Sequence, residues 1–197
     1  MKPLTFVGFR RAAAVSVAVM MMALSAIGCN IQYTNEDFKL VIAPDGSGEL
    51  AITIKNIGSV NSESHLRQKD LRELQDAARG DESVKEAAAK GVALKQRRLE
   101  FVDYRLDGYV EAGAKKYRDL FEVFTNYSLE MDDRIYLIPL NGSVARAELS
   151  EGGEIVVRNG RYAFAWPLES KTLSFTAAYK VRGTPFSYEY QRQFKKR

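Results

Sequence analysis

The sequence has few of the residues that most often form metal sites, disulfides and nucleophilic catalytic sites. Its 197 residues include one cysteine, Cys29, and one histidine, His65. A single cysteine excludes an intrachain disulfide, and a histidine without a second histidine or another cysteine makes a poor metal site. The chain also lacks a Gly-x-Ser-x-Gly motif, a phosphate-binding loop and zinc-ligand spacing. We therefore expect no metal, no cofactor and no catalytic residue, and we expect the protein not to be an enzyme.

An excess of positive charge is also missing beyond the N-terminal segment. The whole chain has 29 basic and 25 acidic residues, which gives a net charge of +4. Lys2, Arg10 and Arg11 are the only charged residues before Cys29, so 26 basic and 25 acidic residues remain after Gly28. Nucleic-acid binding needs a concentrated basic surface. Nucleic acid is therefore not an expected partner.

Residues 1–28 have the organisation of a secretory signal peptide. A basic segment that ends at Arg11 precedes an apolar run of about sixteen residues, 12–27. At ~1.5 Å per helical residue this run spans roughly 24 Å, which is less than the ~30 Å hydrocarbon core of a bilayer. A leader that is removed is therefore favoured over a permanent membrane helix, and an uncleaved signal anchor is the alternative.

The end of this leader, Leu24-Ser25-Ala26-Ile27-Gly28-Cys29, resembles the lipobox of bacterial lipoproteins. The resemblance implies cleavage between Gly28 and Cys29 and lipidation of Cys29 by diacylglycerol and palmitate-type acyl chains. Two or three such chains are needed for stable membrane attachment. Asn30 is not the aspartate that in some enteric bacteria signals retention in the inner membrane. The expected location is thus the cell envelope, with the periplasmic face of the outer membrane favoured over the inner membrane.

We expect an α+β fold after the leader. Residues 29–37 are polar and indicate a tether. Residues 38–125 are expected to form a hairpin–helix–hairpin–helix unit, and residues 126–197 a mainly antiparallel β region, in one continuous domain or two small ones. The first hairpin is predicted by alternating apolar residues on either side of the turn Pro44-Asp45-Gly46-Ser47-Gly48.

The middle of the chain predicts two helices, a second hairpin and a third helix. Leu66, Leu71, Leu74 and Ala78 recur near helical spacing up to Gly80, and a second short helix runs from Asp81 to Gly91. Strands are expected over 92–106 and 108–114, with Asp107-Gly108 as the turn between them. The aromatic stripe Tyr117, Leu120, Phe121 and Phe124 predicts the last helix.

This order of elements resembles that of mycobacterial LppM-type envelope lipoproteins over residues 38–124. The similar parts are the Asp45-Gly46-Ser47-Gly48 hairpin, the polar helix, and Asp107-Gly108-Tyr109-Val110 leading to the aromatic helix. The resemblance implies an envelope-facing α/β domain for which lipid or ligand binding has been proposed. It implies no catalytic residues, and residues 126–197 depart from it.

Several polar residues have two interpretations. His65 could act as a general base, but no oriented partner is identifiable and the residue stands at a predicted helix start. Asp103 and Asp107 are two carboxylates near a turn, without a third ligand at calcium-loop spacing. Asp132-Asp133 could bind a cation or form a turn. Asn141-Gly142-Ser143 matches a glycosylation acceptor, although in a bacterial protein it indicates a turn.

The second half is rich in aromatic residues and hairpin turns. Asn159-Gly160 is the strongest hairpin signal in this region. The aromatic side chains suit half-buried strand positions, or alternatively a groove for a glycan or lipid; they are Tyr162, Trp166, Tyr179, Tyr188 and Tyr190.

The sequence therefore predicts a lipid-anchored, non-enzymatic envelope lipoprotein that binds a protein partner or a lipid-like ligand at the membrane surface. One alternative is a membrane-tethered hydrolase with a carboxylate-based site, because glycosidase chemistry needs only two carboxylates. Another is an assembly factor without a ligand pocket.

Overall fold

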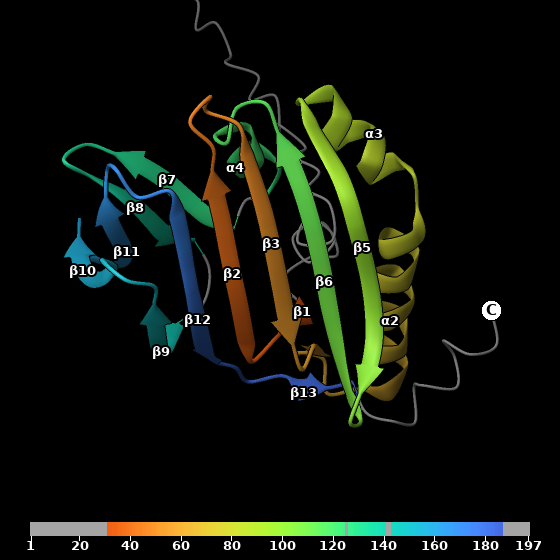
Figure 1. Ribbon diagram of the computed structural model, residues 1–197. Helices are drawn as coiled ribbons and strands as arrows, with labels where there is room; N and C mark the ends of the chain where they lie inside the picture. The colour runs from red at the N-terminus through yellow and green to blue at the C-terminus, as the bar shows by residue number, and fades with distance from the viewer. Residues whose placement is uncertain (1–30, 125, 141–142, 187–197) are drawn as a thin grey trace, which may run out of the picture.

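The computed structural model describes residues 31–124, 126–140 and 143–186 (Figure 1). Of these residues, 53% lie in strands and 19% in helices, and all strand pairings are antiparallel. The helices are α2 (Ser64–Arg79), α3 (Glu82–Ala89) and α4 (Asp119–Val123). The strands are β1 (Ile31–Gln32), β2 (Asn35–Ile42), β3 (Gly48–Lys55), β4 (Gly58–Ser59), β5 (Val92–Val102), β6 (Arg105–Ala114), β7 (Tyr127–Met131), β8 (Arg134–Pro139), β9 (Ser143–Leu149), β10 (Glu154–Arg158), β11 (Arg161–Pro167), β12 (Thr172–Lys180) and β13 (Thr184–Pro185).

The strands form three sheets. The large sheet has six strands in the order β5-β6-β3-β2-β12-β9, and the small sheet has four in the order β10-β11-β8-β7. Two-residue strands complete a third sheet in the order β1-β4-β13. Strands from both ends of the described chain, β1 and β13, therefore pair with the same central strand.

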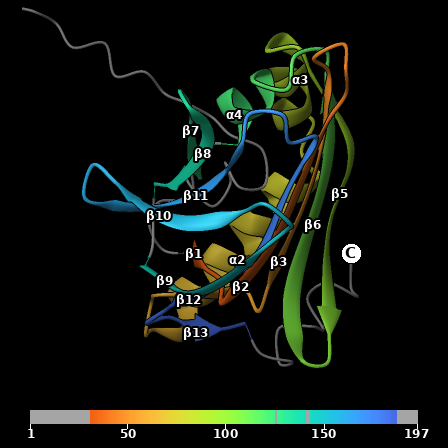
Figure 2. The same cartoon turned by 60° about the vertical axis from the view of Figure 1, so that its left-hand side comes forward.

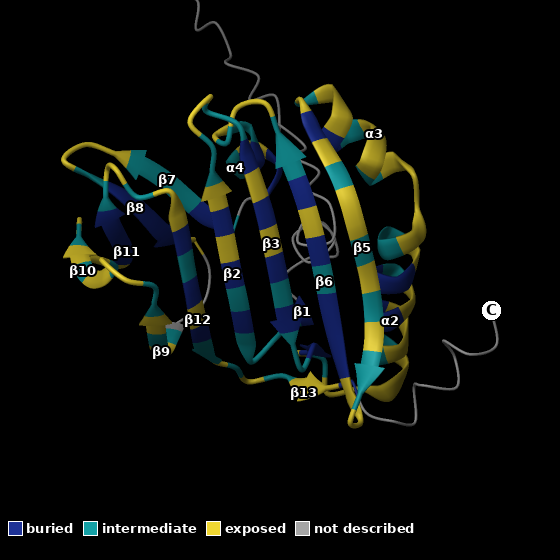
Figure 3. Cartoon of the chain, viewed as in Figure 1, coloured by how far each residue is buried: buried dark blue, intermediate teal, exposed yellow. Residues whose placement is uncertain are grey.

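The large sheet has one covered face and one open face. The three helices and the small sheet all lie on the same side of it (Figures 1 and 2). Alternation explains the difference: Phe38 and Leu40 of β2 point to the covered side, whereas Lys39 and Val41 point outward and are exposed. The same alternation of buried and exposed residues follows the neighbouring strands in Figure 3.

The predicted α+β class was wrong. The fold is mainly antiparallel β, its helices sit mid-chain, and the predicted N-terminal hairpin–helix–hairpin–helix unit does not form. The reason is that the two predicted hairpins, β2–β3 and β5–β6, do not form a separate unit. β2 also pairs along its length with β12 (residues 172–180), so residues from the expected β region continue the same sheet.

The predicted tether was also wrong where the structure describes it. Ile31 is buried, β1 occupies residues 31–32, and β2 begins at Asn35. The polar composition of this segment predicts a linker surrounded by solvent. Its acid Glu36 instead points inward and is satisfied by hydrogen bonds from three hydroxyl groups. The segment that follows Asn30 is therefore part of the sheet structure.

The second hairpin turns earlier than its sequence suggests. Asp103 and Tyr104 form the turn, with φ angles of 47° and 64°, and Asp107-Gly108 lies inside β6. The Asp107 side chain instead accepts a hydrogen bond from the Asn56 backbone N–H at 2.9 Å. Asp-Gly is a local turn signal, but here the Asp107 carboxylate bonds a residue 51 positions away, and this long-range contact keeps Asp107 inside the strand.

The core lies between the large sheet and the layer that covers it. Leu71 and Leu74 of α2 contribute to it from the helical side, and Phe164 and Trp166 of β11 from the small sheet. The α2 helix ends at Arg79, before the expected stop Gly80. In the described ranges, no helix is both long and apolar enough to span a bilayer.

Candidate functional site

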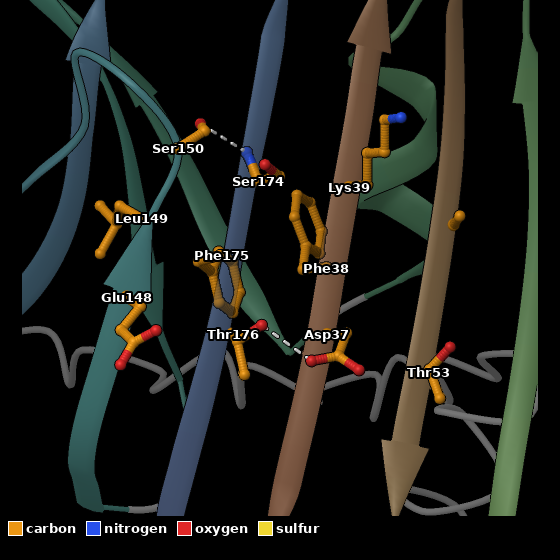
Figure 4. A pocket seen from close by; sticks show the side chains of 11 residues that line it. Asp37, Phe38, Lys39, Thr53, Glu148, Leu149, Ser150, Ser174, Phe175 and Thr176 are labelled. Atoms are coloured by element: carbon orange, nitrogen blue, oxygen red, sulfur yellow. Dashed lines mark hydrogen bonds between the residues drawn. The ribbon is translucent and has the colours of Figure 1, made fainter.

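A polar groove of about 420 Å³ lies on the open face of the large sheet (Figure 4). Register places its side chains in rows across four strands. Thr53, Asp37, Thr176 and Glu148 are successive cross-strand partners on β3, β2, β12 and β9. The next row contains Ala51, Lys39 and Ser174 on the same strands, and Ser150 follows β9. The many small side chains leave the space that forms the groove.

The charges of the groove are partly paired. Asp37 Oδ2 lies 2.6 Å from Lys55 Nζ, and Asp37 Oδ1 accepts a hydrogen bond from Thr176 Oγ1 at 2.8 Å. Glu148 contacts Arg146 on the same strand. A second depression of about 250 Å³ shares Lys39 and Ala51 and extends the polar surface across β3 and β6. The surface therefore presents both signs of charge together with hydroxyl groups.

A second polar cluster lies on the opposite face of the same sheet, around Glu36 on β2. Glu36 is fully buried, and its Oε2 atom accepts hydrogen bonds from Tyr33, Tyr127 and Tyr179 at 3.0, 2.8 and 3.0 Å. The hydroxyls of Tyr127 and Tyr179 are also 2.5 Å apart, and Asn126 Nδ2 donates to the Tyr33 hydroxyl at 3.1 Å. We call Glu36 and these three tyrosines the Glu36 cluster. It joins β2, β12 of the large sheet, β7 of the small sheet and the segment before β2.

The hydrogen-bond geometry of the Glu36 cluster favours a protonated carboxyl group. Four short contacts connect Glu36 Oε2 and the three hydroxyls, but the hydroxyls supply only one proton each. A protonated Glu36 supplies the fourth: its Oε2–H donates to one of the tyrosine hydroxyls, which frees that hydroxyl to donate to its neighbour. The other carboxyl oxygen, Oε1, is buried and has no hydrogen-bond partner, so an ionised carboxylate is poorly solvated there.

Burial changes the acidity of the whole cluster. It raises the pKa of Glu36 from its ordinary value of 4.5 to about 6, while the three tyrosine hydrogen bonds oppose this shift. Burial, followed by the neighbouring Glu36 charge, raises the pKa values of Tyr33, Tyr127 and Tyr179. Glu36 is closed to solvent, so the cluster does not present its carboxyl group to a substrate.

The structure does not bring the predicted polar candidates into one site. His65 is largely exposed on α2 and lies 3.4 Å from Glu63. Asp103 belongs to a turn. Asp133 accepts a hydrogen bond from Tyr136 at 2.7 Å, which lowers the pKa of Asp133, and Asp132 faces Arg158. Each of these four residues therefore has a local structural explanation, and they do not share a site.

The aromatic candidates divide between core and surface. Trp166 is buried and donates to Ser150 Oγ at 3.1 Å, and Tyr179 joins the Glu36 cluster. Tyr162 is 62% exposed on β11. Tyr188 and Tyr190 lie outside the described residues, as do Gly28, Cys29 and the Asn141-Gly142 part of the glycosylation motif.

Sequence reasoning missed both the groove and the Glu36 cluster. One signal pointed to the cluster: Glu36 is in phase with Phe38 and Leu40, so the alternation that predicts a strand also places this acid on the inward face. Its partners Tyr127 and Tyr179 lie 91 and 143 residues away, and no local pattern identifies them.

Comparison with known protein families, curated proteins and solved structures finds no match for this chain. The resemblances to lipoproteins noted above therefore stay predictions. The groove must be interpreted from its own chemistry.

Proposed function

We propose that the protein is a lipid-anchored envelope lipoprotein, cleaved between Gly28 and Cys29 and held by acyl chains on Cys29. It is non-enzymatic and binds a protein partner at the membrane surface, with the periplasmic face of the outer membrane as its location. The leader pattern supports the anchor. The early start of β1 adds a geometric consequence: two residues span at most about 7 Å, which holds the body close to the bilayer.

The polar groove is the observation that supports a protein partner. Small-molecule and lipid sites are concave and mostly apolar, whereas this groove is open and its lining is mixed: hydroxyls, acids and Lys39 alternate with apolar residues such as Leu149 and Ala51. Interfaces between proteins that also exist apart are about as polar as ordinary surface and use many hydrogen bonds. Of the two occupants predicted from the sequence, the groove chemistry favours a protein surface over a lipid-like ligand.

The hydrolase alternative draws on two carboxylates, Asp37 and Glu148, that line the same groove. Asp37 is held by both Lys55 and Thr176 in a structural arrangement. General acid–base chemistry needs two carboxyl groups with different, tuned protonation states. The acid whose pKa is raised to about 6, Glu36, is buried on the other face. The groove therefore supports binding better than hydrolysis.

Photo-crosslinking in cells tests the groove. A photoreactive residue at Thr53, inside the groove, should give a discrete crosslinked partner, whereas one at Lys85, exposed on α3, should not. Lys39→Glu should abolish the Thr53 product because it reverses the charge of the one basic side chain among the described residues that line the groove. Identical products at Thr53 and Lys85, or a product insensitive to Lys39→Glu, would contradict the proposal.

The anchor is tested separately by Cys29→Ser. We expect loss of acylation and release of the protein from membranes. Unchanged membrane fractionation would show that an uncleaved leader holds the protein instead. Because the variant leaves the groove intact, this result does not depend on the partner experiment.

A further inference from the structure

Strand β10 is an edge strand with an apolar exposed surface. Within the described residues it pairs only with β11, and the β10–β11 hairpin projects away from the large sheet in Figure 2. Ile155 and Val157 are 46% and 70% exposed, and Tyr162, which is opposite Val157, is 62% exposed. Natural proteins usually protect edges with charge or bulges, because an open edge is a template for pairing with another strand.

The free backbone groups of this edge can be assigned from the turn. Asn159 and Gly160 have φ angles of 53° and 74°, the conformation of a two-residue type I′ turn, which confirms the hairpin predicted here. Arg158 and Arg161 close that turn as a hydrogen-bonded pair, and pairs alternate along the ladder. The N–H and C=O groups of Ile155 and Val157 therefore point to the open edge.

The sequence of β10, Glu154-Ile155-Val156-Val157-Arg158, is complementary to itself when two copies run antiparallel. With Val156 on the two-fold axis, Glu154 lies opposite Arg158 of the second copy, and Ile155 lies opposite its Val157. Glu154 also pairs with Arg134, and Arg158 with Glu130, in its own chain, so a contact across the axis would extend these existing ion pairs. Opposite charges across strands are favourable and like charges are unfavourable. A parallel arrangement would instead place Glu154 beside Glu154.

We propose that β10 pairs antiparallel with β10 of a second copy of this chain, centred on Val156. The edge-facing N–H and C=O groups of Ile155 then bond those of Val157 in the second copy, and the reverse. These bonds join the two small sheets into one. A residue on the two-fold axis must face its own equivalent. Val156 can do so as a non-hydrogen-bonded pair, because its backbone N–H and C=O groups point to β11 of its own chain and not across the axis.

The two edges of the large sheet, β9 and β5, are less suited to such pairing. On the edge strand β9, Arg146 and Glu148 are exposed and contact each other. On the edge strand β5, Arg98 and Glu100 are exposed, and a bulge interrupts the pairing near Lys95. Charge and irregularity of this kind protect edges. β10 lacks both protections at Ile155 and Val157.

The contact is short, so its strength depends on how both copies are held. Attachment to one bilayer, which rests on the proposed acylation of Cys29, increases the effective concentration of the two strands. We therefore expect the dimer to be most populated in the membrane-bound full chain. Release from the membrane should reduce the dimer without changing its register.

Disulfide crosslinking of the full chain in cells tests the register. Val156→Cys places two thiols on the axis, where Cα atoms of a non-hydrogen-bonded pair are ~4.5 Å apart, within the range of a disulfide. We expect a covalent dimer. Glu154→Cys is the matched control, because its two copies lie four positions apart in this pairing, roughly 13 Å, and should not crosslink. Equal crosslinking of the two variants, or none for Val156→Cys, would overturn the proposal.

A backbone substitution supplies a second readout. In the Val156→Cys background, Val157→Pro, which removes an edge-facing N–H, should abolish the crosslink, whereas Val157→Thr should keep it. Charge reversal is not diagnostic here, because Glu154 already pairs with Arg134, and Arg158 with Glu130, within one chain. Equal crosslinking of the Val157→Pro and Val157→Thr variants would contradict the proposal.

One further arm separates this proposal from that of the anchor. With Cys29→Ser, the Val156→Cys crosslink should persist at lower yield. An unchanged yield would contradict the contribution of the anchor but not the strand pairing. Crosslinking of the parent chain, whose only thiol is Cys29, would show that Cys29 is not acylated.

Discussion

Glu36 and Asp37 are neighbours on β2, but the large sheet gives them opposite surroundings. Glu36 is fully buried among three tyrosine hydroxyls, and its pKa is raised to about 6. Asp37 lies in the open groove, where Lys55 and Thr176 hold it. The difference shows that the covered face carries the stability of the fold. The open face is free to present binding chemistry, so substitutions on the two faces should differ in kind.

The largest difference is expected between the adjacent residues Phe175 and Thr176 of β12. Phe175 is buried, with its ring centroid 4.9 Å from that of Phe38 and 4.5 Å from that of Phe164. Phe175→Ala should lower the free energy of unfolding by about 3–5 kcal/mol, because it removes buried surface and leaves a cavity. Thr176→Ala, on the open face, should cost within about 1 kcal/mol. Urea unfolding measures both.

Similar losses for the two β12 variants would contradict this comparison. They would show that Thr176, and with it the groove, belongs to the stabilising core. Thr176→Val is a useful control because it keeps the shape of the side chain but removes the hydrogen bond to Asp37.

Features that depend on neighbouring residues could be predicted from the sequence. Asn159-Gly160 forms the expected turn because both residues accept positive φ angles, and α2 ends before Gly80 as expected. Asp107-Gly108 was a wrong turn prediction because Asp107 bonds the distant Asn56 backbone. Local patterns fail where a long-range contact decides the conformation.

The fold class and the site depend on such long-range contacts. The pairing of β2 with β12 joins residues 35–41 to residues 172–178, and no local signal in either segment specifies the other. The groove needs this pairing, because Asp37 and Thr176 meet only across it. Glu36 alone gave a readable signal, as an acid in the inward phase of an apolar strand.

The pH dependence of stability should distinguish Glu36 on the covered face from Asp37 on the open face. The raised pKa of Glu36 means that the folded state binds more protons than the unfolded state between pH 4.5 and about 6. The free energy of unfolding should therefore fall by roughly 2 kcal/mol as the pH rises through this window, and change little above it. Glu36→Gln, which resembles the protonated acid, should remove this component from chemical-denaturation curves measured between pH 4.5 and 7.5.

An unfolding free energy that rises over the same window in the wild-type chain would contradict the proton count of the cluster. Asp133 provides the contrasting behaviour, because a hydrogen bond from Tyr136 lowers its pKa. Its contribution is lost only as the pH falls through more acidic values. Asp133→Asn should therefore leave the Glu36 step in place.

The smallest effect is expected at Asp37 and Lys55 on the open face. Their charged atoms are 2.6 Å apart, but both side chains are more than a third exposed, at 38% and 39%. Solvent screening limits such a pair to about 0.2–1 kcal/mol, and added salt weakens it further. Lys55→Met should therefore change the free energy of unfolding by less than about 1 kcal/mol at low salt, and by still less at ~1 M salt. A larger, salt-insensitive loss would mean that the pair is shielded from water, and the open face could then not present Asp37 to a partner.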